Sequence, residues 1–199
     1  MGSAIQNLVI FKLGWLACIL FAAALLPEFA VLAVAIAVLV HLARAPVPVK
    51  EALFLLSAGA VGLAWETMML HSGLITYPGS EAQALLAPYW IVAMWVLFAT
   101  TINHGFRWLK RNWAVASIFG LLGGPMAFYA GSAAGAAELG NPIAALAVIG
   151  AGWAILLPLL TLIADTIIDS ALLEPESRSA NKKPASALEP RLERTSGNA

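Results

Sequence analysis

The sequence predicts an all-α membrane protein, a polytopic bundle of about six transmembrane helices. Hydrophobic residues make up 61% of the 199 residues and charged residues only 11%, whereas a soluble domain has roughly 25% charged residues. Six apolar segments approach the length of about 20 residues that a helix needs to cross a membrane. The predicted spans are residues 5–26, 28–43, 51–70, 88–106, 113–136 and 143–165.

Prolines and polar residues set the boundaries of these spans. Pro27 and Glu28 alone join the first two spans, which predicts a tight helical hairpin. Pro88 opens the fourth span, because proline costs little at the first turn of a helix, and Asn141 and Pro142 open the sixth, with Asn141 as its N-cap. The chain becomes polar after the sixth span, so we predict a membrane domain at 1–170 and a disordered cytoplasmic tail at 171–199.

The distribution of basic residues predicts that both termini are cytoplasmic. Lys and Arg lie in the connections after the second and fourth spans and in the tail, whereas the other three connections contain only acidic charges. Cytoplasmic loops of membrane proteins carry an excess of Lys and Arg. A cleaved signal peptide at the first span is the alternative, but its removal would leave an odd number of spans, which this charge pattern disfavours.

Glu66, in the stretch WETMMLHSGLITYP, is the first candidate for a functional residue. Gly59, Gly62 and Glu66 share one face of the third span at helical spacing, and small residues mark the approach of another helix, so we expect Glu66 to point into the bundle. An ionisable residue within a span suggests function, as a general acid or base in a water-poor site. A structural glutamate bonded to Trp, Tyr or free backbone groups would give the same pattern, so both interpretations stay open.

The fifth span carries a stripe of small residues and a proline within GLLGGPMAFYAGSAAGA. The members of the stripe, which share one face, are Gly120, Gly124, Ala127, Gly131 and Gly135. Pro125 removes a backbone donor, so we expect a kink or a short unwound stretch there, which is tolerated in a membrane only where protein or a cavity covers it. We therefore predict that this span packs close to the third span near Glu66, with Gly124 and Pro125 at the site.

Aromatic residues and one histidine complete the predicted ligand site. Trp65 and Trp90 lie near predicted span boundaries, where tryptophan favours the interface, and Trp95 lies deeper. These residues could line a pocket for an apolar ligand, although packing between helices is the commoner use of such residues. His71 is an interfacial residue that could also act beside Glu66. One His and one Glu do not make a metal site, and we expect no metal and no cofactor.

Other polar residues gather toward the predicted inner side. Thr100 and His104 share a face of the fourth span, with Asn103 beside them, and Asp165 lies at the inner end of the sixth. One interpretation is a polar network that links His104 to Asp165. The other is that helix ends become polar as they approach the lipid headgroups, which is also how we interpret His41.

Three blocks, WETMMLHSGLITYP, PYWIVAMWVLFATTINHGFRWL and GLLGGPMAFYAGSAAGA, resemble in this order a bacterial inner-membrane family known as domain of unknown function twenty-eight seventy-eight. The resemblance covers about residues 5–168 and excludes the tail. The family's Trp-Glu, Pro-x-Trp and Gly-Gly-Pro motifs stand here at Trp65, Glu66, Pro88, Trp90, Gly123, Gly124 and Pro125. The resemblance brings no established activity, but members are often encoded near lipid-modifying enzymes, which implies lipid metabolism.

A fainter resemblance is to membrane-embedded carotenoid cyclases and hydratases. In those enzymes a Glu is followed on the same part of the chain by a Gly and then a Tyr, which Glu66, Gly73 and Tyr77 imitate. The further acidic residues that such enzymes carry on other helices are not evident in this sequence.

The leading hypothesis is a bacterial inner-membrane protein that binds or modifies a membrane lipid or isoprenoid in an outer-half pocket around Glu66. The alternatives are an accessory or assembly subunit of a membrane lipid-modifying enzyme, and a small transporter. The sequence does not decide whether the protein is an enzyme: it contains no P-loop, Rossmann glycine pattern, HExxH motif or nucleophile elbow. It offers no basic face for nucleic acid, and its single cysteine, Cys18, leaves no disulfide framework.

Overall fold

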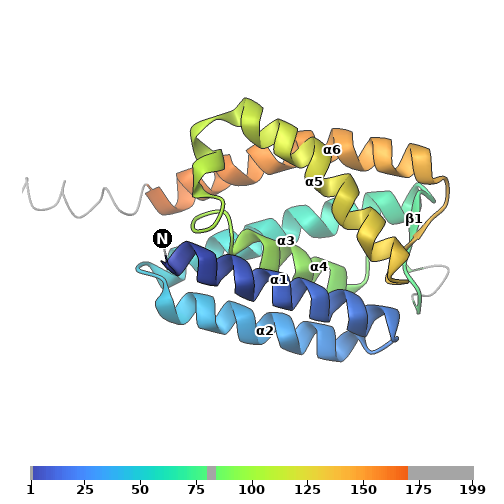
Figure 1. Ribbon diagram of the computed structural model, residues 1–199, viewed down its shortest axis with the longest axis horizontal. Coiled ribbons are helices and arrows are strands. Elements are labelled where there is room, and N and C mark those ends of the chain that lie inside the picture. Colours follow the sequence, from blue (N-terminus) through green and yellow to red (C-terminus); the bar gives the residue numbers. More distant parts are fainter. Residues whose placement is uncertain (1, 80–83, 170–199) are drawn as a thin grey trace, which may run out of the picture.

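A computed structural model describes residues 2–79 and 84–169 of the chain, and it confirms the all-α class within these residues (Figure 1). The predicted tail, 171–199, lies outside them. The α-helices are α1 (Gly2–Ala23), α2 (Pro27–Arg44), α3 (Pro48–His71), α4 (Tyr89–Ala99), α5 (Trp113–Ala133) and α6 (Pro142–Ala164). The short elements are the strands β1 (Ile75–Thr76) and β2 (Glu138–Leu139), the 3-10 helix η1 (Arg107–Arg111) and the π-helical turn η2 (Asp165–Asp169).

The helices form three hairpins of consecutive helices, and the pair α3–α4 lies between the pairs α1–α2 and α5–α6 (Figure 1). Helix α4 is the central one, since it packs against α1, α2 and α3. The two short strands lie together at one end of the bundle, here called the strand end. The N-terminus and η1 lie at the opposite end, here called the N-terminal end.

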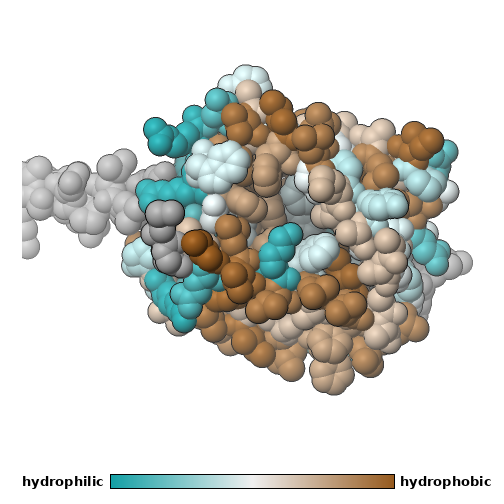
Figure 2. All heavy atoms as spheres, viewed as in Figure 1, coloured by the Kyte–Doolittle hydropathy of each residue, from teal (hydrophilic) through white to brown (hydrophobic). Residues whose placement is uncertain are grey.

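Five of the helices, α1, α2, α3, α5 and α6, are long and apolar enough to cross a membrane. Their outward faces carry many exposed Leu, Ile, Val and Phe side chains, and Figure 2 shows one largely apolar face of this kind. Contiguous apolar surface of this extent is unfavourable in water and favourable against lipid tails. These features are those of a helical membrane protein.

Helix α4 is shorter than predicted, because it ends at Ala99 instead of residue 106. The hydroxyls of Thr100 and Thr101 donate to the carbonyl oxygens of Leu97 and Phe98 at 2.7 and 2.6 Å. These bonds satisfy two of the last carbonyls of the helix. The chain then continues toward the N-terminal end in turns, which are buried at Thr101 and Ile102 and half-buried at 103–106. A short helix and a turn segment therefore stand where one long helix was predicted.

Two residues of the predicted small-residue stripe of α5, Gly120 and Gly124, form a close packing surface, but Ala127 and Gly135 are exposed. The predicted partner helix was wrong. Helix α5 packs mainly against α6 instead of α3. A Cβ atom at Gly120 would overlap the backbone of Trp153 on α6, and one at Gly124 would overlap the Trp153 ring. The short connection between α5 and α6 makes this pairing local in sequence. Helix α5 also runs unbroken through Pro125, so the unwound form of the predicted break is not present.

Substituting two glycines of α5 will show how much this close approach contributes to stability. Gly120→Ala places a methyl group against the Trp153 backbone, so we expect a loss of about 1–3 kcal/mol through overpacking. Gly123→Ala is the matched control, because a Cβ there has no neighbour within 4 Å, and it should stabilise the helix by up to about 1 kcal/mol. Unfolding in detergent micelles measures both. Equal stability of the two variants would contradict the α5–α6 contact.

Candidate functional site

Glu66 is fully buried, at 0% exposure, which confirms that it points into the bundle. Its Oε1 accepts a hydrogen bond from the indole nitrogen of Trp95 at 2.8 Å, and its Oε2 accepts one from the hydroxyl of Tyr77 at 2.5 Å. The three side chains come from α3, from α4 and from the segment that follows β1. Each carboxyl oxygen therefore has a donor, as a buried polar group requires.

Tyr77 reaches Glu66 because the chain folds back at the strand end. Gly73, with a φ of +70°, lets the backbone turn after α3 in a conformation that favours glycine. Strand β1 then pairs antiparallel with β2, with Ile75 opposite Leu139. Burial, and then the neighbouring Glu66, raise the pKa of Tyr77 well above its ordinary value. Its hydroxyl therefore stays protonated and donates to Glu66.

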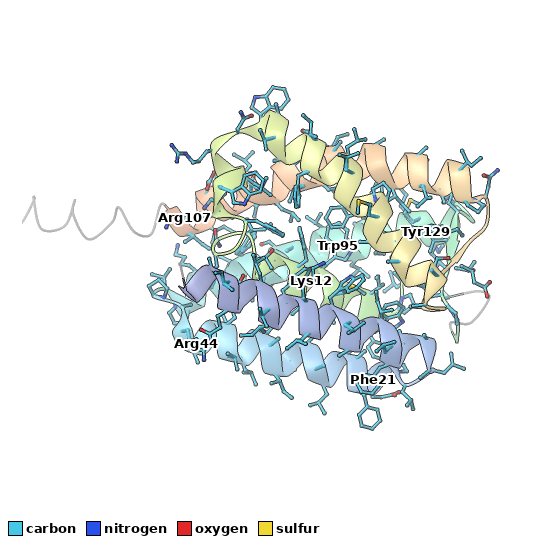
Figure 3. The ribbon with its side chains drawn as sticks, in the orientation of Figure 1. Lys12, Phe21, Arg44, Trp95, Arg107 and Tyr129 are labelled. Carbon is cyan, nitrogen blue, oxygen red and sulfur yellow. The ribbon has the colours of Figure 1, made fainter. Side chains whose placement is uncertain are left out.

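Trp95 is held in place by α3 on one side and α6 on the other, and Figure 3 shows it between the helices. Gly62 of α3 leaves room for it, since a Cβ there would overlap the Trp95 ring. Trp153 of α6 stacks on it, with ring centroids 4.7 Å apart and planes at 23°. The chain of contacts runs from Glu66 through Trp95 and Trp153 to the glycines of α5. The deep tryptophans are thus packing residues.

Of the other predicted site residues, only Trp90 joins this group. It is 4% exposed, so it is a core residue and not an interfacial one, and its ring meets Tyr77 edge to face at 5.5 Å. Trp65 turns away, because its ring lies over Gly152 of α6. His71 is exposed at the end of α3, with its Nε2 3.4 Å from the carbonyl oxygen of Ala84.

Gly124 and Pro125 face α6 and not the third span. Trp153 covers Gly124, and Pro125 Cγ lies 3.2 Å from the position of a Cβ at Gly150. The predicted site therefore separates into two parts. Glu66, Trp90 and Trp95 form one part, and Gly124 and Pro125 belong to the α5–α6 interface. The sequence prediction missed Tyr77 as the partner of Glu66. The signals were the tyrosine alternative in the structural interpretation of Glu66 and the Glu66–Gly73–Tyr77 order noted in the fainter resemblance, but the path of the loop was not readable from spacing.

A small cavity adjoins the Tyr77–Trp90 pair. It has a volume of about 50 Å³ and is lined by aromatic and small apolar residues of α1, α4, α5 and the strand end. The lining residues are Trp15, Ile19, Tyr77, Trp90, Ile91, Met94, Ala127, Phe128, Gly131, Ala136 and Ala137.

At the N-terminal end, a polar network connects His41 to Asp165. His41 Nε2 lies 3.3 Å from Glu51 Oε2, the amide of Asn103 donates to Glu51, and Lys110 donates to Asn103. Lys110 then pairs with Asp165 at 2.7 Å. The predicted network between His104 and Asp165 therefore exists in an indirect form, because His104 touches it only through His41.

His104 packs its ring against that of His41, with centroids 4.9 Å apart. Glu51, which is 2% exposed, was not a sequence candidate, because its position at the start of a span resembles that of any charged residue at a helix end.

The comparison with protein families gives one match, to a family described as "Protein of unknown function (DUF2878)", over residues 4–159. The chain belongs to this family. The match includes Glu66, Tyr77, Trp90 and Trp95, so the buried carboxyl group and its neighbours lie within the DUF2878 region. No curated protein and no solved structure matches the chain, and the fainter resemblance to carotenoid cyclases and hydratases has no support in these comparisons.

Replacing Glu66 with glutamine will measure what the buried carboxyl group contributes to stability. Gln has one acceptor oxygen, so its amide NH2 would face one of the two donors, Trp95 or Tyr77. A buried donor without an acceptor costs about 1–3 kcal/mol, and we expect Glu66→Gln to lower the unfolding free energy in micelles by that amount.

The matched control is Glu28→Gln, because Glu28 also accepts from a tyrosine, Tyr89, but at an exposed position. A change at such a site is usually within about 0.5 kcal/mol. If Glu66→Gln unfolds like the Glu28 variant, the two hydrogen bonds do not hold α3 and α4 together.

Proposed function

We propose that this DUF2878 protein resides in the bacterial inner membrane with both termini in the cytoplasm, and that it binds the hydrocarbon tail of a membrane lipid or isoprenoid. The observation that carries the proposal is the cavity beside Tyr77 and Trp90. It is lined almost entirely by carbon, and one of its lining residues, Ala127, is exposed on α5. An apolar cavity that reaches the outer surface of a membrane bundle would meet lipid tails.

The size of the cavity limits what enters it. At about 50 Å³ it has room for one or two methylene or methyl groups, since a water molecule occupies roughly 30 Å³ in the liquid. The bound tail would therefore lie along the outer surface of the bundle and insert only a bend or a methyl branch into the cavity. A branched isoprenoid chain or a bent acyl chain fits this description.

The buried Glu66 supports binding by fixing the wall of the cavity. Tyr77 lines the cavity, whereas Glu66 lies behind it and accepts a hydrogen bond from the Tyr77 hydroxyl at 2.5 Å. Any chemistry on a ligand would therefore pass through the Tyr77 hydroxyl, with Glu66 orienting it. This arrangement favours binding over catalysis by Glu66 itself.

Lys12 supports a lipid that also carries a negative charge. It is exposed on α1, and its Nζ lies 5.2 Å from the ring centroid of Trp15, which lines the cavity. Figure 3 shows it midway along α1, where a charge in a membrane is costly and by default suggests function. A lipid carboxylate or phosphate would offset that cost.

A small transporter finds less support, because aromatic rings fill the bundle between Glu66 and the polar N-terminal end. Trp153 stacks on Trp95 and meets Phe98 edge to face at 5.3 Å. A polar path would have to cross these rings. An accessory subunit would use the same apolar faces to bind a partner helix, so it becomes an outcome of the experiment below.

Filling the cavity will test lipid binding. Gly131 lines it, and the nearest atom to a Cβ there is Ile19 Cδ1 at 3.7 Å. The Cβ of Gly131→Leu therefore enters without a backbone clash, and the rest of the side chain, which is larger than the cavity, fills it completely. We expect lipid that copurifies with the wild type, measured by mass spectrometry of extracts, to fall at least about fivefold, which corresponds to roughly 1 kcal/mol of binding free energy.

Gly123→Leu is the matched control, because it adds the same side chain to the same helix where nothing lies within 4 Å. It should retain lipid as the wild type does. Equal retention by both variants would overturn the proposal. Loss of a partner protein instead of lipid from Gly131→Leu would favour the accessory subunit.

Reporter fusions will test the orientation. A cytoplasm-active fluorescent reporter fused after residue 199 should be active, and one inserted in the connection between α5 and α6 should not, because the basic residues of η1 lie on the opposite side from that connection. The reverse result would place the cavity in the other leaflet.

A further inference from the structure

The residues His41, Glu51 and His104 form a compact cluster at the N-terminal end, 10 residues or more apart in sequence. One ligand atom from each, two imidazole nitrogens and a carboxylate oxygen, lies within 4.8 Å of the others. They come from α2, from α3 and from the turns after α4, so the fold brings them together from three segments. His41 and Glu51 are buried.

Two histidines and one carboxylate are a ligand set for Zn²⁺ or Fe²⁺. Ligand atoms about 2.0–2.2 Å from a tetrahedral ion are about 3.3–3.6 Å apart, and His41 Nε2 and Glu51 Oε2 already lie at 3.3 Å. The other distances between ligand atoms of the three residues are at most 4.8 Å, so a small rotation of a side chain would bring them into the same range. We propose that His41, Glu51 and His104 bind one divalent transition-metal ion.

An unpartnered atom supports this proposal independently. The Nδ1 of His104 is buried and has no hydrogen-bond partner in the described part of the chain. A buried polar nitrogen without a partner costs about 1–3 kcal/mol, and a metal ion would remove that cost. The Glu66 carboxyl, by contrast, has a donor for each oxygen.

Residues next to the three proposed ligands hold them in position by hydrogen bonds, as is usual around metal sites. Asn103 donates to Glu51 at 3.3 Å, and Lys110 fixes the Asn103 amide by donating to its Oδ1 at 3.1 Å. Asp165 pairs with Lys110 at 2.7 Å and offsets its positive charge, which would otherwise repel a cation. Such outer contacts orient metal ligands and tune their affinity.

Three protein ligands would leave one coordination position for water or a substrate atom, as in catalytic zinc sites. Lys110, which reaches the cluster through Asn103, also lines an open cavity of about 610 Å³, together with Arg107, Trp108, Arg111 and Asp165. The mostly basic wall of this cavity would attract anionic groups to the N-terminal end.

Metal binding will be measured on the full chain in detergent micelles, purified with an affinity tag that contains no histidine. After removal of metal with a chelator, Zn²⁺ is titrated against a chromophoric competitor, and Co²⁺ reports the geometry by its visible absorption. We expect one ion per chain and intense tetrahedral Co²⁺ bands that excess Zn²⁺ abolishes. Binding well below one ion per chain would overturn the proposal.

His104→Ala is the decisive variant, because the loss of Nδ1 removes no hydrogen bond and should leave the fold intact. Its Zn²⁺ dissociation constant should rise at least about 100-fold, and that of Asn103→Ala about 10–100-fold. His71→Ala, the exposed histidine at the strand end, is the matched control and should bind as the wild type. If His104→Ala binds Zn²⁺ as tightly as the wild type, these residues do not form the site.

Discussion

The rest of the structure depends on a carboxyl group buried where no water can reach it. Glu66 is fully buried, and a buried carboxyl without hydrogen-bond donors is strongly unfavourable. Trp95 and Tyr77 supply those donors, so α4 has to lie against α3, and the segment after α3 has to fold back over it. The pairing of β1 with β2 then links the same segment to the α5–α6 connection. One polar requirement thus sets the positions of elements from all three hairpins.

Glycines complement this constraint by making room for the donors and for the rings behind them. Gly62 accommodates Trp95, Gly124 accommodates Trp153, and Gly152 accommodates Trp65. Lipid tails are as apolar as the helices, so burying apolar surface between helices contributes little free energy to their association. Close van der Waals packing contributes much of it instead. A tryptophan ring that packs directly on the backbone at a glycine makes dense contact of this kind. Contacts between a tryptophan and a glycine of a neighbouring helix, together with a few hydrogen bonds, therefore hold the bundle together.

The sequence predicted the class, the positions of the helices and the direction of Glu66 because each follows from local patterns. Apolar length, the Asn141–Pro142 start and the Gly59–Gly62–Glu66 face are all readable within one helix, and the Asn141 cap is present, with its Oδ1 3.1 Å from the nitrogen of Ala144. The partner of the α5 stripe was wrong, because a row of small residues shows that a helix approaches without showing which one. The end of α4 at Ala99 was missed, because threonines that bond back to the preceding turn do not interrupt an apolar run. Tyr77 and Glu51 were not predicted, because their hydrogen bonds to Glu66 and to His41 and Asn103 join segments that are distant in sequence.

The Glu66 carboxyl group and the cluster of His41, Glu51 and His104 differ in how completely the protein satisfies their polar atoms. Each oxygen of Glu66 accepts a hydrogen bond from the protein, so no ligand is needed to satisfy the carboxyl group. At the N-terminal end, His104 keeps a buried nitrogen without a partner, and Glu51 shares weaker contacts of 3.3–3.5 Å with His41 and Asn103. A protein gains nothing in stability from such a deficit. The indole nitrogens of Trp65 and Trp153 also lack a partner among the described residues, so a deficit supports an ion only where ligand atoms converge as well, as they do at His41, Glu51 and His104. We therefore interpret the glutamate that stands out in the sequence as a structural residue, and we propose the polar cluster at the opposite end as the place where an ion binds.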